Sequence, residues 1–92
     1  MIKTFRCRDT ATMFAGERVA RFAGIAAVAT RKLQQIDSAA TLQSLRAPPG
    51  NRLEQLKGDR RGQHCSRIND QWRLCFVWQS AGVLNVEIVD YH

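Results

Sequence analysis

The stretch 71-QWRLCFVW-78 decides how this chain folds, because large apolar side chains occupy every second position in it. Successive side chains of a β-strand point to opposite faces of the sheet, so this pattern predicts a strand with one buried face. The side chains predicted to share the buried face are Trp72, Leu74, Phe76 and Trp78. Those predicted to share the other face are Arg73, Cys75 and Val77.

Two flanking segments, 63-QHCSRI-68 and 83-VLNVEIVDYH-92, are also predicted to be strands, which makes an antiparallel meander. Asn69-Asp70 is a plausible two-residue hairpin turn before the central strand. That turn would place Arg73 opposite Ser66, and it would bring His64 opposite Cys75 on the face of Arg73. It therefore predicts which polar groups meet on the open side of the sheet.

The pairing of the last strand is open between two registers. If 79-QSAG-82 is a four-residue loop, Trp78 pairs with Val83 and Asp90 becomes a diagonal neighbour of Arg73. A shift by one residue moves the apolar side chains of the last strand into the core instead. It also sends Asp90 to the helix face, since a one-residue slip exchanges the two faces.

Helices are predicted before the strands. In 21-RFAGIAAVATRKLQQID-37, apolar residues recur at helical spacing. They are Phe22, Ile25, Ala29, Leu33 and Ile36. With these helices gathered on one face of the sheet, the sequence predicts a single α+β domain spanning residues 1–92.

Shorter elements are predicted around that helix. Asp9 and Thr10 can cap a short helix that Gly16 would end, and Ser38 can cap another that 47-APPGN-51 must stop. Residues 2–7 are predicted to form a first strand.

Composition narrows the class of protein. The chain has 92 residues and a formal net charge of +6, which favours a polyanionic partner such as RNA, DNA or the ribosome. Its three cysteines form no CxxC pair, and the start of the chain has no apolar stretch of secretory length. The most apolar segment, 22-FAGIAAVAT-30, is about half as long as a membrane span needs. We therefore expect a cytoplasmic protein with reduced thiols and no membrane partner. With neither an HExxH motif nor zinc-ligand spacing in the sequence, we expect no metal and no cofactor.

Basic residues are concentrated in the second half of the chain. Arg73 is distinctive because it lies in mid-strand on the face opposite the apolar residues, where a guanidinium can clamp a phosphate. Further arginines are candidates for RNA binding. They are Arg46, Arg52, Arg60, Arg61 and Arg67.

Several pieces of the sequence together resemble the HigB-type toxins of the RelE/ParE superfamily. These pieces are 56-LKGDR-60, the hairpin 67-RINDQWRLCF-76 and the terminal 90-DYH-92, with 47-APPGNRL-53 and 1-MIKTF-5 extending the likeness over nearly the whole chain. The resemblance implies helices packed on an antiparallel sheet. It also implies a ribosome-dependent, metal-independent mRNA endonuclease that a HigA-type antitoxin holds inactive.

The resemblance also implies which residues are catalytic. Carried over position by position, they are Lys57, Arg73, Asp90, Tyr91 and His92. Members of this group can carry histidine in the loop where this chain has Glu54. Either Glu54 has become the base, which is the role we assign to it here, or the site depends more on His92. Arg73 and Lys57 would bind the scissile phosphate, Tyr91 would stack on a base, and His92 would protonate the leaving oxygen.

Two other functions fit part of the pattern. A ParE-like relative would have the same fold but would inhibit a topoisomerase without cutting RNA, so the choice rests on the site residues rather than on the fold. A simple basic nucleic-acid-binding module would follow from the net charge alone, and its affinity would fall steeply with salt.

Overall fold

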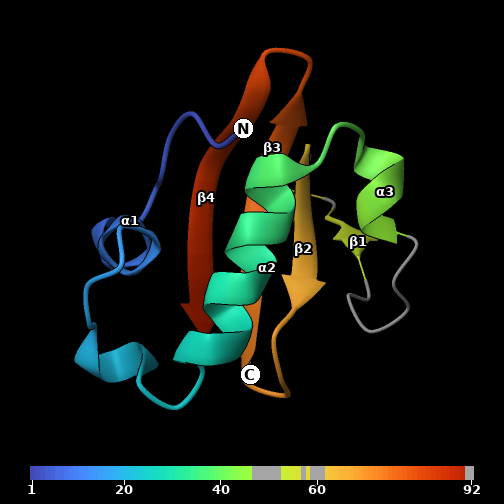
Figure 1. Cartoon of the computed structure of the whole chain (residues 1–92). Helices are drawn as coiled ribbons and strands as arrows, with labels where there is room; N and C mark the ends of the chain where they lie inside the picture. The colour runs from blue at the N-terminus through green and yellow to red at the C-terminus, as the bar shows by residue number, and fades with distance from the viewer. Residues whose placement is uncertain (47–52, 57, 59–61, 91–92) are drawn as a thin grey trace.

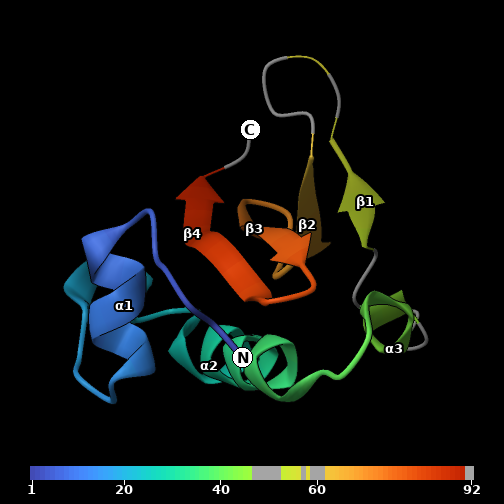
Figure 2. The same ribbon diagram turned by 90° about the horizontal axis from the view of Figure 1, so that it is seen from above.

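The computed structural model describes residues 1–46, 53–56, 58 and 62–90. Its helical elements are α1 (Arg8–Phe14), the short 3-10 helix η1 (Ala20–Phe22), α2 (Ala26–Ser38) and α3 (Leu42–Arg46). Its strands are β1 (Glu54–Gln55), β2 (Gln63–Arg67), β3 (Trp72–Gln79) and β4 (Gly82–Asp90). The strands form one antiparallel sheet in the order β1-β2-β3-β4. Helix α2 lies across one face of it (Figures 1 and 2), which confirms the predicted α+β fold.

The core lies between this sheet and α2. The helical stripe predicted from the sequence is confirmed, since Phe22, Ala29 and Leu33 have no exposed surface. From the sheet, the core receives chiefly Leu74, Phe76, Val83, Val86 and Ile88. We call the side of the sheet that α2 covers the helix face and the other side the open face.

The long helix predicted from residue 21 is broken near its start. Residues 20–22 form η1, and α2 begins only at Ala26 after Ile25 as its N-cap. Gly24 lies in the break, where glycine is about 1 kcal/mol less favourable in a helix than alanine. The apolar side chains keep their predicted face, but the backbone does not keep one helix.

The predicted caps are wrong. Cys7, not Asp9 or Thr10, is the N-cap of α1, and the carboxylate of Asp9 instead accepts a hydrogen bond from Nε of Arg21 at 2.8 Å. The hydroxyl of Thr10 is buried and accepts a hydrogen bond from the backbone N–H of Ile88 at 3.1 Å. Both side chains therefore form hydrogen bonds with residues distant in the sequence instead of capping the helix. The helix does end before Gly16, which has a φ of 98°.

Ser38 does not cap α3 either. It is the last residue of α2, and its hydroxyl donates to the backbone carbonyl of Gln34 at 2.9 Å. Thr41 takes the capping position, because its hydroxyl oxygen accepts the backbone N–H of Ser44 at 3.2 Å. The predicted stop at 47-APPGN-51 lies outside the described residues.

The predicted first strand is reduced to two bridges. Ile2 and Phe5 form isolated parallel bridges with Val83 and Val86, so the N-terminal segment runs beside the outer edge of β4 (Figure 1). The backbone N–H of Lys3 donates to the carbonyl of Val83 at 2.7 Å. This segment covers part of an edge that would otherwise present unpaired backbone groups.

The β2–β3 pairing differs by one residue from the predicted one. Arg73 lies opposite Arg67 rather than Ser66, and His64 lies opposite Phe76 rather than Cys75. The cause is a longer connection than the two-residue turn expected at Asn69-Asp70. The side chain of Asn69 accepts the backbone N–H groups of residues 71 and 72 at 2.9 and 2.8 Å, which folds the chain around that side chain.

The β3–β4 pairing contains both of the registers left open by the sequence. Trp78 pairs with Val83 as the first register predicts, although the turn is tighter than four residues because Gln79 pairs with Gly82. An irregularity between Cys75 and Val77 then shifts the pairing by one. Asn85, with a φ of 55°, lies on β4 at this shift, in the left-handed region that asparagine tolerates better than most residues.

Beyond the irregularity the second register holds. Leu74 pairs with Ile88, and Trp72 pairs with Asp90. Val86 and Ile88 therefore enter the core, whereas Leu84 stays half-buried on the other side of the shift. In the described part of the chain, no helix has the length and apolar character needed to cross a membrane.

Candidate active site on the open face

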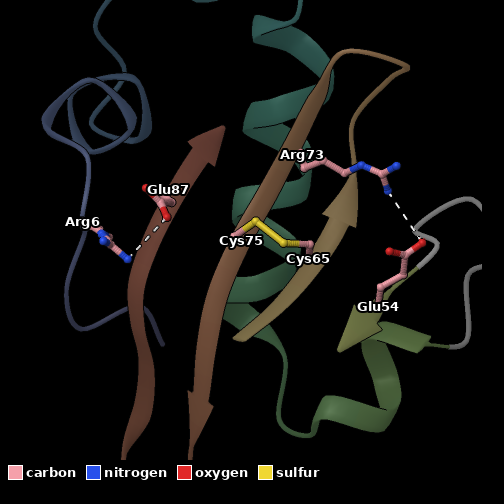
Figure 3. Close-up of a disulfide and its surroundings, with 6 residues drawn as sticks. All are labelled: Arg6, Glu54, Cys65, Arg73, Cys75 and Glu87. Atoms are coloured by element: carbon pink, nitrogen blue, oxygen red, sulfur yellow. Dashed lines mark ion pairs between the residues drawn. A yellow bond between two sulfur atoms is a disulfide. The ribbon is translucent and has the colours of Figure 1, made fainter. Parts of the chain in front are cut away.

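Alternation along the three long strands gathers a row of functional side chains on the open face. Arg67 and Arg73 are directly paired across β2 and β3. The next row toward the middle of the sheet contains Cys65 and Cys75, and Glu54 of β1 pairs with Cys65. Two arginines from different strands and one carboxylate from a third are thus held on one surface. Figure 3 shows Arg73 and Glu54 of this set.

Arg73 is largely buried although it is charged. Its side chain is 20% exposed, and its Nη1 lies 3.9 Å from Oε1 of Glu54, whose side chain is 59% exposed. Figure 3 shows the guanidinium extending over β2 toward Glu54. At this distance the pair is an ion pair rather than a short hydrogen bond, so the carboxylate compensates the charge without a tight bidentate contact. The structure therefore brings together two of the predicted catalytic residues.

Arg67 is the second cation of this surface. Its Nη2 pairs with Oδ1 of Asp70, which is almost fully exposed, and its own side chain is 27% exposed. An ion pair with so exposed a carboxylate contributes little to stability and is readily exchanged for another anion. The sequence had placed Arg67 only among the general RNA-binding candidates, but the pairing puts it directly beside Arg73.

A further ion pair lies across the sheet from Arg73. Nη1 of Arg6 is 3.9 Å from Oε1 of Glu87, and Glu87 pairs with Cys75 on β4. The side chain of Glu87 is only 13% exposed, so its charge needs such compensation. Reading across the open face in Figure 3, the two ion pairs flank the central cysteines.

The expectation of reduced thiols is wrong for two of the three cysteines. Cys65 and Cys75 form a disulfide, with their Cα atoms 4.2 Å apart. The one-residue change in the β2–β3 register is the reason, because it brings these two residues directly opposite each other. Cys7 is free and lies at the start of α1.

Asp90 does not become the diagonal neighbour of Arg73 that the first register predicted. It pairs with Trp72, which puts it on the helix-face side of β4, and its Oδ2 accepts a hydrogen bond from Nε2 of Gln71 at 3.1 Å. Even so, Arg73 pairs with Val89, the residue before Asp90. The last residue of β4, Asp90, therefore follows directly after the residue that lies opposite Arg73.

Apart from Arg46, the other predicted catalytic and RNA-binding residues lie outside the described part of the chain. Tyr91 and His92 follow Asp90 and lie outside the described residues. The remaining predicted residues outside them are Arg52, Lys57, Arg60 and Arg61.

Arg46 belongs to a different side of the molecule. Arg46 is the last residue of α3. The residue that its charge affects is His64, whose ring stacks on Phe76 on the helix face with ring centroids 6.0 Å apart. Burial chiefly, and the Arg46 charge in addition, lower the pKa of His64 below its ordinary value of 6.5. Among the described residues, Nδ1 of His64 has no hydrogen-bond partner. His64 is therefore a buried neutral imidazole rather than a member of the open-face site.

Sequence reasoning missed the pairing of the two arginines and the disulfide for one shared reason. Both depend on the length of the β2–β3 connection. Asn69 could have indicated a longer connection, since asparagine side chains often accept a hydrogen bond from the backbone two residues ahead. Within the described ranges, no three His, Cys, Asp or Glu side chains are arranged to hold a metal ion.

Comparison with known proteins matches this chain to a family model and to a curated relative. Residues 17–92 match the family model described as the RelE-like toxin of the type II toxin-antitoxin system HigB. Toxin HigB-1 of Vibrio cholerae serotype O1 (strain ATCC 39315 / El Tor Inaba N16961) is 46% identical over 55 residues, a match that spans 60% of this chain and 58% of that relative. The chain thus matches a little over half the length of this curated relative.

A solved structure shows the same fold at low identity. In the YoeB-YefM complex from Staphylococcus aureus, one chain superposes with a TM-score of 0.56 at 16% identity, with 100% of this chain and 98% of that chain covered. Together with the family match over most of the sequence, this confirms the resemblance inferred from the motifs. The chain belongs to the HigB family of RelE-like toxins of type II toxin-antitoxin systems.

Proposed function

We propose that this toxin is a ribosome-dependent, metal-independent endoribonuclease that cleaves translated mRNA in the cytoplasm. The observation that carries the proposal is the direct pairing of Arg67 with Arg73 on the open face, beside the carboxylate of Glu54. Two guanidinium groups on adjacent strands suit a phosphodiester, because each presents donors in a planar fork that matches phosphate oxygens.

RNA contains its own nucleophile, so the protein needs to supply position, charge and proton transfer. In the proposed reaction the 2′-oxygen attacks the phosphorus and the 5′-oxygen leaves. Arg73, with Lys57, binds the scissile phosphate and stabilises the charge that develops on its oxygens. Arg67 adds a second guanidinium to the same surface and exchanges Asp70 for the phosphate.

The proton transfers fall to two further residues. Glu54 accepts the proton of the 2′-hydroxyl. Its separation of 3.9 Å from the Arg73 guanidinium supports this role, because a phosphate bound by Arg73 would then lie near the carboxylate. His92 donates a proton to the leaving 5′-oxygen. The negative charge of Asp90, two residues earlier in the sequence, would favour the imidazolium form. Tyr91 stacks on a base next to the cleaved linkage.

The family match is the basis for the partners that we propose for this toxin. We propose that a HigA-type antitoxin binds the toxin and inhibits it, and that the ribosome presents the mRNA. The solved neighbour is itself in a complex, YoeB with YefM, which supports a protein partner for this chain. The arginines from 52 to 61 would extend the contact with RNA.

The test is to map mRNA 5′ ends after brief expression of the toxin. Cuts inside translated frames, which disappear when translation is blocked, are expected for the wild type and not for Arg73→Ala. Arg31→Ala is the matched control, because it removes the same charge from an exposed position on α2. If Arg73→Ala cuts as the wild type does, the open-face site is not the catalytic one.

The same experiment distinguishes the other two functions. A ParE-like topoisomerase inhibitor would leave mRNA uncut and damage DNA. A simple basic binding module would neither cut mRNA nor damage DNA. Its affinity for nucleic acid would fall by the same amount in Arg31→Ala and in Arg73→Ala.

A further inference from the structure

The disulfide lies in the centre of the surface that carries the proposed site. Cys65 and Cys75 are 1% and 0% exposed and are directly opposite each other in β2 and β3. Each is two residues from an arginine of the site on the same strand and the same face, Cys65 from Arg67 and Cys75 from Arg73. Figure 3 shows the sulfur–sulfur bond between the strand of Arg73 and the strand that pairs with Glu54.

We propose that this disulfide is a redox switch that sets the activity of the toxin. The proposal rests on the proposed function, since it assigns a regulation to that site. In the oxidised state the bond holds β2 and β3 so that Arg67, Arg73 and Glu54 have the arrangement described above. In the reduced state that arrangement is lost and cleavage falls.

The physical reason is the space that two thiols need. Once the bond is broken, the two sulfurs separate to the ordinary contact distance between heavy atoms, about 3.5–4 Å, and each gains a hydrogen. Because both residues are buried, a thiol cannot turn into solvent to relieve the contact. The buried thiols must therefore rotate and repack against their neighbours, which include Arg67 and Arg73 in the next row of the same face. A misplacement of about an ångström in a site can cost about 100-fold in rate.

The proposed substrate, translated mRNA, is found in the cytosol, where thiols are normally kept reduced. Disulfides are rare in the cytosol, and those that occur there are usually transient, catalytic or redox-sensing. A toxin that acts on translating ribosomes would meet that reducing environment. A cellular or added dithiol supplies the electrons: the Cys65–Cys75 bond breaks, each sulfur gains a proton and becomes a thiol, and the dithiol becomes a disulfide.

The two redox states are compared in one preparation of the full chain. Alkylation in denaturant after oxidation should label only Cys7, and alkylation in denaturant after treatment with dithiothreitol should label all three cysteines. In a translation extract poised with glutathione, oxidised toxin should cut mRNA at least tenfold faster than reduced toxin. Three labelled thiols after oxidation, or equal cutting in both states, would overturn the switch.

A second readout separates failure of the switch from failure of the proposed function. The NMR signals of the side-chain Nε–H groups of Arg67 and Arg73 should move on reduction, while that of Arg31 on α2 should not. If these signals move but neither state cuts mRNA, the nuclease is wrong and the structural coupling stands. If they do not move, the coupling itself is wrong.

Two variants serve as controls. Cys7→Ser should keep the full redox response, because Cys7 is not part of the disulfide. Cys65→Ala combined with Cys75→Ala should cut slowly in both conditions and show no response to dithiothreitol. A persistent response in that double variant would contradict the proposal, and the wild-type comparison remains decisive where the double variant does not fold.

Discussion

The two faces of the sheet differ in the kind of side chain that they carry. On the helix face, the side chains of Leu74, Phe76 and Val86 are fully buried and pack against α2. On the open face, Arg73 alternates with Leu74 and Phe76 along β3, and Arg67 pairs with it from β2. Both arginines form ion pairs with carboxylates at or near the surface. The helix face holds the fold together by apolar burial, and the open face is thereby free to carry charge. Substitutions on the two faces should therefore separate stability from activity.

The largest effect is expected from Phe76→Ala on the helix face. Phe76 has no exposed surface and stacks with His64, so its loss leaves a cavity that should lower the free energy of unfolding by about 3–5 kcal/mol. Urea denaturation followed by circular dichroism measures this. Val77→Ala, one residue away on the open face and half-buried, should cost much less. Similar losses for both would mean that the two faces do not differ in this way.

The next effect is expected from Glu54→Gln on the open face. If Glu54 is the base, the amide should slow cleavage by about 100-fold, as loss of a general base typically does. RNA binding should become tighter at the same time, because the substitution removes a negative charge next to Arg73. Urea denaturation should show little change, since Glu54 is well exposed. An unchanged cleavage rate would make Glu54 a bystander and leave proton abstraction to another group.

A smaller effect is expected at Asn85, where the register of β4 changes. Its φ of 55° is unfavourable for a β-branched side chain, so Asn85→Val should destabilise the protein by about 1–2 kcal/mol. Asn85→Gly should be nearly neutral, because glycine adopts this conformation freely. Thermal unfolding of the two variants gives the comparison. Equal stability of the valine and glycine variants would show that this backbone conformation does not hold the register.

The smallest effect is expected from the titration of His64. Because burial and Arg46 lower its pKa in the folded protein, the unfolded chain binds a proton more readily than the folded one. Stability should therefore be unaffected above the unfolded pKa of about 6.5 and should fall as the pH decreases from there toward the folded pKa. Urea midpoints between pH 7.5 and pH 5 measure this for the wild type and for His64→Phe, in which this part of the decrease should disappear.

Much of the helix face could be predicted from the sequence. Apolar side chains at every second position in β3, and at helical spacing before it, identified Leu74, Phe76, Leu33 and Ile36 as core residues. Motifs also pointed to Arg73 and Glu54, which the structure brings to 3.9 Å from each other. The predicted caps failed because Asp9 and Thr10 found tertiary partners, which local patterns do not contain.

The sequence by itself determined the period of each segment, the side chains that share a face within a strand, and the positive charge of the surface. Only the tertiary structure decided how the strands align with one another. The Asn69 side chain lengthened one connection by hydrogen bonding, and the left-handed backbone of Asn85 accommodated a one-residue shift in the next pairing. A single-residue slip exchanges the two faces of a strand, so these two local events determined that Arg67 faces Arg73, that Cys65 meets Cys75, and that Asp90 lies on the helix-face side.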